Sequence, residues 1–212
     1  MAKFEVCTHK FADLSESTFG VSILNDSKYG FATCGDLMRL SLLRAPKAPD
    51  AHADMGRHHI RWAILPHAGP LGSLTVRAGF NFNNPMKLYG IIGGEAQDAK
   101  IHVGRALLQS LRLDGDPGMV LDTVKRGEDD MDVQRWEESA LRTRKSRCVV
   151  VRIYDSLGGR CKGWLHTGSL GVKRGWRCNL LEDEGEKAEV DDQGRVRIEL
   201  GPFEVGTWRL EV

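Results

Sequence analysis

The sequence predicts an all-β fold built from packed antiparallel sheets, and two observations support this prediction. Apolar and polar residues alternate with period two along several runs, as side chains do on a half-buried strand. These runs are short and recur about every ten to fifteen residues between Gly, Pro, Asn and Asp turns, as in all-β sandwiches. A chain of 212 residues is long enough to bury a sizeable core, in one large β domain or two small ones.

The first third of the chain shows strand patterns broken by turns. Residues 19–24 alternate, and the Asn, Asp and Gly of residues 25–30 predict a tight connection, so we expect a pair of strands around it. Residues 36–44 form the next apolar run. The two prolines of residues 45–50 then predict a loop.

A central strand is predicted from His58 to Leu65. The side chains of His58, Ile60, Trp62 and Ile64 would point to one face of the sheet and the intervening ones to the other. Pro66 has no N–H to donate to a ladder, so we expect the strand to end there. Residues 74–82 predict a further extended segment.

The remainder alternates strand patterns with less regular segments. Residues 88–94 are apolar but rich in glycine, and residues 99–113 fit a helical stripe only partly, so a strand is favoured there. Residues 128–147 carry a run of charges around one Trp, which predicts a surface helix or a loop. Any helix is expected only in these last two segments. Strands are predicted at 120–125, 148–154, 176–181, 195–200 and 207–212.

Composition excludes several classes of partner. The net charge of +1 gives no global field that would attract nucleic acid or an anionic membrane, and no apolar run is long enough to span a bilayer. The N-terminal residues lack the apolar core of a secretory signal. The five cysteines are scattered and show no C-x-x-C spacing, so we expect reduced thiols in an intracellular compartment.

Three histidines lie close together in the sequence without forming a metal-binding pattern. His58 and His59 would leave opposite faces of a strand, and His67 follows a proline, so we predict no metal site in this chain. The alternative is that Asp54, His58 and His67 hold loops to the sheet through hydrogen bonds. We expect Trp62, Trp176 and Trp208 in the core, since they sit in strand patterns.

An ordered series of short blocks carries a family resemblance. Asp54-x-Gly56-x-His58 is followed by a β run and Pro66-His67-x-Gly69. Together with blocks at residues 4–16, 20–30, 40–46, 151–159 and 179–182, this series resembles the C-terminal β region of the family 38 glycoside hydrolase α-mannosidases. The likeness is to the cytosolic and fungal vacuolar branch, and it is weakest between residues 86 and 147.

The resemblance implies a domain layout. A galactose-mutarotase-like super-sandwich would occupy residues 1–127, and a small terminal β-sheet subdomain would occupy residues 148–212. Residues 128–147 would be a charged insertion between them.

The resemblance also implies a function. Family members are retaining, zinc-dependent α-mannosidases that act in mannoside catabolism. Their nucleophile and zinc ligands belong to an N-terminal catalytic α/β domain that nothing in this sequence matches. We therefore expect no catalytic residue, metal ligand or cofactor in this chain, no activity of the chain alone, and a cytoplasmic or vacuolar location.

Arg44 is the one candidate site residue. The segment 42–46 resembles the family segment that delivers an arginine to the bound sugar, and a guanidinium can fork onto sugar hydroxyls. The alternative is an ordinary strand-end arginine. The expected partners are the catalytic α/β domain, in cis or in trans, and mannosides, with no nucleic acid and no membrane. The catalytic domain should cover an apolar surface bordered by Arg44 and the 46–49 loop.

Three readings of the chain stay open from the sequence. It could be the C-terminal β portion of an α-mannosidase, as a fragment, a truncated product or a separate subunit. It could be a free-standing carbohydrate-binding β-sandwich, since five tryptophans and three tyrosines offer stacking surfaces. It could also be a purely structural β module.

Overall fold

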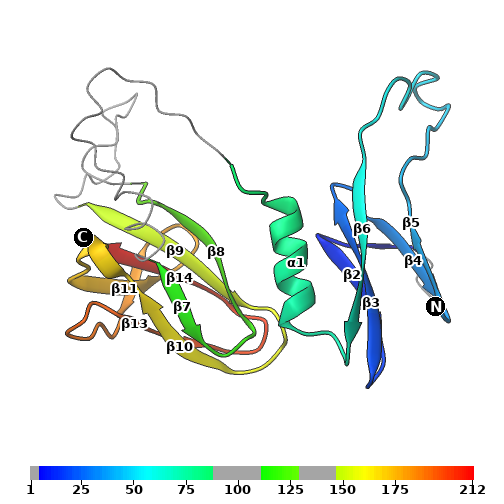
Figure 1. Cartoon of the computed structure of the whole chain (residues 1–212). Helices are drawn as coiled ribbons and strands as arrows, with labels where there is room; N and C mark the ends of the chain where they lie inside the picture. Colours follow the sequence, from blue (N-terminus) through cyan, green and yellow to red (C-terminus); the bar gives the residue numbers. More distant parts are fainter. Residues whose placement is uncertain (1–4, 88–110, 129–146) are drawn as a thin grey trace, which may run out of the picture. The chain divides into compact units, whose positions relative to one another are not determined.

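The chain divides into two compact units, each built mainly of antiparallel β-sheet. The computed structural model describes residues 5–87, 111–128 and 147–212. Unit 1 is Met1–Gly90 and unit 2 is Ile91–Val212. Figure 1 follows the elements of each unit in chain order. The predicted all-β, antiparallel sandwich is confirmed, whereas the predictions for 88–94, most of 99–113 and nearly all of 128–147 fall on residues outside the described ones.

Unit 1 contains two three-stranded sheets. Sheet A has the order β1-β4-β5 and sheet B the order β2-β3-β6. The turn at residues 27–29 leads from β3 of sheet B to β4 of sheet A, so the predicted pairing of the two strands around it is wrong. Ser27 takes a positive φ of 67° there, and the chain changes sheet. The strands are β1 (Val6–Cys7), β2 (Phe11–Ser15), β3 (Phe19–Asp26), β4 (Gly30–Cys34), β5 (Leu37–Leu40) and β6 (Arg61–Ala68).

The strand predicted from His58 differs from the observed β6 at both ends. β6 starts at Arg61, pairs only with β3 among the described residues, and continues through Pro66 to Ala68. The Gly69 N–H donates to the Thr18 carbonyl, which fixes the alternation of hydrogen-bonded pairs along this ladder. Pro66 therefore occupies a position whose nitrogen faces away from β3. β6 is thus an edge strand that tolerates a proline, where a central strand was predicted.

The extended segment predicted at 74–82 is instead the helix α1 (Ser73–Asn83). Contacts with sheet B explain this correction. Val76 is buried, and Thr75 hydrogen-bonds Ser22 of β3 through their hydroxyl groups, 3.0 Å apart. Gly79 lies so close to Phe11 that an added Cβ would come within 2.9 Å of the ring. Tertiary packing thus outweighs the weak helix propensity of the Thr, Val, Gly, Phe and Asn residues here.

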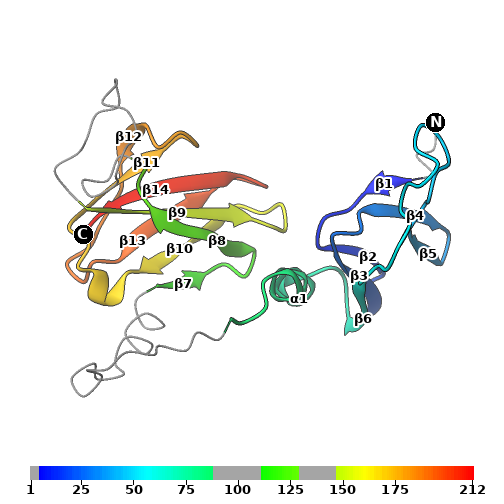
Figure 2. The same ribbon diagram turned by 90° about the horizontal axis from the view of Figure 1, so that it is seen from above.

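Unit 2 is a two-layer sandwich with a closed apolar core, and its layers can be followed in Figures 1 and 2. Sheet C has the order β13-β10-β7 and sheet D the order β12-β11-β14-β9-β8. Eleven apolar residues form the buried cluster between the sheets, and all but the loop residue Val172 lie in strands; Val151, Leu165 and Ile198 are fully buried. The strands are β7 (Arg112–Gly115), β8 (Met119–Arg126), β9 (Cys148–Asp155), β10 (Cys161–His166), β11 (Arg174–Cys178), β12 (Glu184–Lys187), β13 (Val196–Leu200) and β14 (Val205–Glu211), with a 3-10 turn η1 (Gly168–Leu170).

The division into units differs from the domain boundary expected near residue 127. β7 and β8 pair with β10 and β9, respectively, so both belong to the sandwich of unit 2 rather than to a domain that ends before it. Residues 120–125 and 148–154 were each predicted as strands correctly. Their mutual pairing could not be inferred, because a charged segment separates them in the sequence.

Unit 2 also buries charges, and it does so in ion pairs. The Glu182 side chain is 4% exposed and its carboxylate lies 2.5 Å from the Lys125 ammonium. Arg209, fully buried, approaches the same carboxylate at 3.8 Å. Hydrogen bonds from Lys125 to Glu128 and Glu182 raise the pKa of that lysine. The Glu182 carboxylate thus lies between two cationic side chains in the interior of unit 2, so removing either cation would leave a buried charge with fewer partners.

Candidate functional site

Arg44 lies in unit 1, four residues beyond the end of β5. Its guanidinium forms an ion pair with the Glu5 carboxylate, and the Ser41 hydroxyl donates to the same carboxylate at 2.9 Å. The Arg44 side chain is 68% exposed. Glu5 and Ser41 thus restrict the orientation of a guanidinium that remains accessible to a ligand.

The motif Asp54-x-Gly56-x-His58 holds the long loop that follows Arg44. The Asp54 carboxylate accepts a hydrogen bond from the Ala45 backbone N–H at 3.0 Å, and His58 Nε2 donates to the Asp54 carbonyl at 2.7 Å. Ala45 and Asp54 both take positive φ, 47° and 59°. These bonds connect the start of the loop to its end beside Arg44. Asp54 and His58 thus form hydrogen bonds as expected, but within the loop and not between the loop and the sheet.

His67 belongs to a separate, buried network beneath α1. Its Nε2 lies 2.7 Å from Asp13 Oδ2, and both side chains are about 95% buried, with 4% and 5% exposed. The Ser22 hydroxyl donates to the same Asp13 oxygen at 2.5 Å and also contacts Thr75 of α1. The network therefore links β2, β3, β6 and the helix. His67 is therefore hydrogen-bonded as expected, but it joins strands of sheet B and does not hold a loop to the sheet.

The Asp13 carboxylate is stabilised in its charged form. Burial acts to raise its pKa, but hydrogen bonds from Ser22, Ser15 and His67 outweigh burial and hold the pKa below the ordinary value of 3.8. The predicted histidines therefore take unrelated partners, His58 in the loop and His67 in the network. Within residues 5–87, 111–128 and 147–212, no three His, Cys, Asp or Glu side chains are placed to share a metal ion. No helix in this part of the chain is long and apolar enough to cross a membrane.

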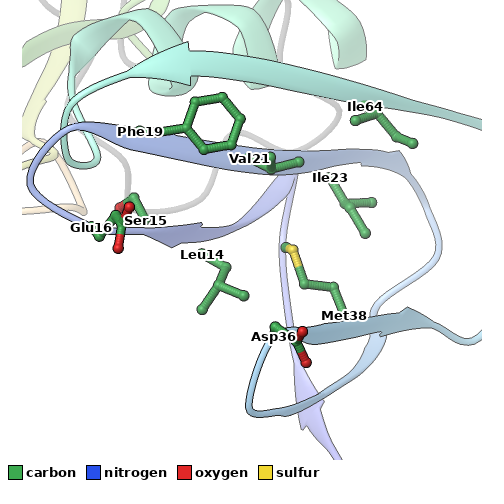
Figure 3. Close-up of a pocket in the computed structure, with 9 residues that line it drawn as sticks. All are labelled: Leu14, Ser15, Glu16, Phe19, Val21, Ile23, Asp36, Met38 and Ile64. Carbon is green, nitrogen blue, oxygen red and sulfur yellow. The ribbon is translucent and has the colours of Figure 1, made fainter.

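An open apolar groove lies between sheets A and B of unit 1. It encloses about 550 Å³. Figure 3 shows apolar side chains of β2, β3 and β6 on one side of it and Met38 of β5 on the other, with Glu16 and Asp36 at its border. Its lining consists of Leu14, Ser15, Glu16, Phe19, Val21, Ile23, Asp36, Met38 and Ile64.

The groove exists because sheet B carries apolar residues on both faces, whereas α1 packs against only one of them. α1 packs on the face that carries Ser22 and Leu24. On the opposite face, Phe19 is 52% exposed and Ile64 is 59% exposed. Trp62 lies on this face by strand alternation and is 49% exposed, so the prediction that it belongs to the core is wrong. Trp208 is 2% exposed and lies in the core of unit 2 as predicted.

The structure does not bring the sequence-predicted site residue to this groove. Arg44 and the 46–49 loop are absent from the lining residues, although the sequence analysis expected them to border the apolar surface. The sequence does contain a pattern that indicates the groove. Phe19, Val21 and Ile23 alternate with small or polar residues, and the partly covered face follows from that pattern once a helix occupies the other.

Two family models match the chain, one in each unit. The glycosyl hydrolases family 38 C-terminal domain matches residues 1–52. The glycosyl hydrolases family 38 C-terminal beta sandwich domain matches residues 118–208.

Curated relatives share the whole length of this chain but are much longer. The alpha-mannosidase of Saccharomyces cerevisiae is 46% identical over 219 residues, which cover 99% of this chain and 19% of the relative. Alpha-mannosidase 2C1 of Mus musculus is 36% identical over 96% of this chain and 18% of its own length. The chain therefore spans about a fifth of the length of the curated relatives it matches.

Solved structures show the same fold. A family 38 glycosyl hydrolase protein from Enterococcus faecalis superposes with a TM-score of 0.66 over 97% of this chain and 22% of that chain, at 19% identity. An alpha-mannosidase from the same organism gives a TM-score of 0.67. At this level of identity the likeness supports the fold.

Proposed function

The chain belongs to glycoside hydrolase family 38 as its C-terminal region, and on this premise we propose that it serves a retaining, zinc-dependent α-mannosidase of oligomannoside catabolism. One observation carries the proposal: the likeness is continuous, with 46% identity to the yeast relative over 99% of the chain. By the same reasoning we place the protein inside the cell, in the cytoplasm or the vacuole.

The proposed role of this chain is support of the catalytic α/β domain, in cis or in trans. The two carboxylates of a retaining mechanism and the zinc ion would belong to that domain. Since the described residues offer no set of three side chains for a metal, we assign no step of hydrolysis to a metal held by this chain. The chain alone should have no α-mannosidase activity.

Arg44 is the residue of this chain that we propose at the sugar pocket. Its guanidinium is exposed, while Glu5 holds it from one side and the Asp54–Ala45 hydrogen bond fixes the adjoining backbone. An oriented guanidinium loses less conformational entropy when it binds a hydroxyl than a freely rotating one does. The proposed contribution of Arg44 is therefore to sugar binding at the rim of the pocket.

A full-length chimera tests this proposal. In it, our chain replaces the matched region of the S. cerevisiae alpha-mannosidase, and hydrolysis of a chromogenic α-mannoside is followed with zinc added. We expect turnover by the chimera and none by the chain alone. Arg44→Ala should raise KM about tenfold, the order of one charged hydrogen bond. Arg57→Ala, at an exposed arginine of the same loop, is the matched control and should leave KM unchanged.

Turnover by the purified chain alone, abolished by a substitution within it, would contradict the support role. An inactive chimera that is folded and soluble would contradict the family function for this chain. Equal KM values for Arg44→Ala and the control would remove Arg44 from the sugar pocket and leave the rest of the proposal in place.

A second candidate function is a free-standing carbohydrate-binding module. The half-exposed Trp62 favours it, because an exposed indole face on a sheet can stack on a sugar ring. Retention of the chain alone on a mannose column, lost in Trp62→Ala, would support this alternative. We expect no retention.

A further inference from the structure

We infer that the apolar groove of unit 1 receives an extended apolar segment that adds to sheet A beside β5. We assign this segment to the polypeptide that precedes the C-terminal region in family 38 relatives. The inference rests on the proposed function, since it identifies the surface through which this chain would contact the rest of such an enzyme.

The first observation is the incomplete cover of sheet B. Phe19, Ile64 and Leu14 line the groove and are exposed by 52%, 59% and 37%. These residues come from all three strands of the sheet, so they form one continuous face. Soluble monomers rarely leave such a face open, and a contiguous apolar surface marks an interaction site.

The second observation identifies where a new strand would pair. Of the strands in sheet A, β5 and its turn supply the groove residues Met38 and Asp36. β5 pairs with β4 alone among the described residues and is therefore an edge strand. The Ser41 N–H donates to the Gly30 carbonyl, so by the alternation of an antiparallel ladder the Arg39 N–H faces β4. The N–H groups of Met38 and Leu40 then point to the open edge.

These two observations define the chemistry of the occupant. An extended segment beside β5 would receive main-chain hydrogen bonds from the edge and lay alternate side chains over the groove, which is the geometry of strand addition. The groove floor demands apolar side chains. Its border carries the carboxylates of Glu16 and Asp36, and no lysine or arginine is among its described lining residues, so the segment should bring a basic residue to each end.

The source of the segment follows from the comparisons. About four fifths of each curated relative lies outside the region that this chain matches, and the matched family domains are C-terminal ones. In the relatives, therefore, a long polypeptide precedes the region that corresponds to this chain and could cover the exposed face of sheet B. A second copy of this chain is the competing occupant. It is less suitable, because the acidic border would meet the same acidic border across a two-fold axis.

Residue-resolved hydrogen exchange tests the inference on the chain alone and on the chimera described above. The Met38 and Leu40 amides should exchange rapidly in the chain alone and about 100-fold more slowly in the chimera, because they gain partners there. The Arg39 amide is an internal control, since it is bonded to β4 in both proteins. Its exchange should change far less.

Substitutions in the groove provide the matched comparison. Phe19→Ser combined with Ile64→Ser should restore rapid exchange of the two edge amides in the chimera, without altering the circular dichroism of the chain alone. Leu74→Ser, at a 62% exposed position on α1, should leave the protection intact.

Each outcome separates the possibilities. Rapid exchange at Met38 and Leu40 in an active chimera would overturn the inference and leave the proposed function standing. Protected edge amides in an inactive chimera would support the inference and overturn the proposed function. Protection in the chain alone that grows with its concentration would assign the groove to a second copy and overturn the inference.

Discussion

The two units bury apolar surface to very different extents, although both are antiparallel sandwiches. Unit 2 closes two sheets over a cluster whose members include six fully buried residues, among them Ile153, Leu165 and Leu210. Unit 1 keeps Phe19, Trp62 and Ile64 about half exposed. Unit 2 thus holds its own core, whereas unit 1 exposes one apolar face of sheet B, the face to which we assign a further segment.

Both units also bury polar side chains. In unit 2 the buried Glu182 lies between Lys125 and Arg209. In unit 1 the Asn25 side chain is 1% exposed, and its amide atoms have no hydrogen-bond partner among the described residues. An unpaired buried amide costs about 1–3 kcal/mol. Because unit 1 also leaves Phe19, Trp62 and Ile64 about half exposed, we expect it to be the less stable unit when the chain is studied alone.

The strongest test of this contrast is a pair of large-to-small substitutions. Leu165→Ala in unit 2 should lower the free energy of unfolding of that unit by about 2–5 kcal/mol, because a fully buried leucine leaves a cavity. Ile64→Ala in unit 1 should change stability by less than about 0.5 kcal/mol in the chain alone. Denaturant unfolding followed by tryptophan fluorescence measures both. Equal losses would mean that the groove is closed in solution.

A second test addresses what holds unit 1 together in place of a core. His67→Ala removes one partner of the buried Asp13 and should destabilise unit 1 by about 1–3 kcal/mol. His59→Ala, at an exposed histidine of the loop, is the control and should have an effect below about 0.5 kcal/mol. Thermal unfolding of each variant is the measurement. A silent His67→Ala would show that the network beneath α1 contributes nothing.

Acid should weaken the network in a defined direction. The pKa of Asp13 is lower in the folded chain than its ordinary value of 3.8, so its contribution is fully present above that value and is lost as the pH falls through the folded pKa. Asp13→Asn should remove this part of the acid sensitivity of unit 1. In unit 2 burial raises the pKa of Asp155, but hydrogen bonds from Phe203, Cys161, Leu157 and Gly158 lower it on balance. Asp13→Asn should leave the acid unfolding of unit 2 unchanged, which stability curves between about pH 5 and pH 2 will show.

The smallest effects are expected at exposed ion pairs, which the two units share. Arg44 pairs with Glu5 in unit 1, and Arg174 pairs with Glu211 in unit 2, with side chains 68% and 59% exposed. Replacing either arginine by alanine should cost less than about 1 kcal/mol. If both variants lose little stability, the proposed sugar binding is the property that distinguishes Arg44 from Arg174. A loss of several kcal/mol at Arg44 would instead make it a structural residue.

Strands with strong alternation could be predicted from the sequence, and their pairing could not. Residues 148–154 and 120–125 stand out by β-branched content, yet only the fold places β8 beside β9. β10 escaped prediction because Gly163 interrupts its pattern. The glycine is needed there, since an added Cβ would come within 2.2 Å of the Asp114 carbonyl oxygen on β7.

The helix and the groove were beyond prediction for a related reason. α1 has no side-chain N-cap and few good helix formers, so its conformation follows from contacts with sheet B. Without α1, the two faces of sheet B cannot be told apart. The motif around Asp54 carries the family resemblance, but the sequence does not reveal its structural role. That role follows from the hydrogen bond that the Asp54 carboxylate accepts from the Ala45 N–H, which ties the two ends of the loop together.

Pro66 has a consequence for solubility. β6 is an edge strand of sheet B and carries the half-exposed Trp62 and Ile64, a combination that favours growth of fibrils by strand pairing. Pro66 places a nitrogen without a hydrogen on that outer edge, two residues from Ile64. A ladder from a neighbouring molecule would lack a hydrogen bond at Pro66, so the proline should disfavour fibril formation. The chain can thereby expose an apolar face of sheet B with a lower tendency to pair with copies of itself along β6.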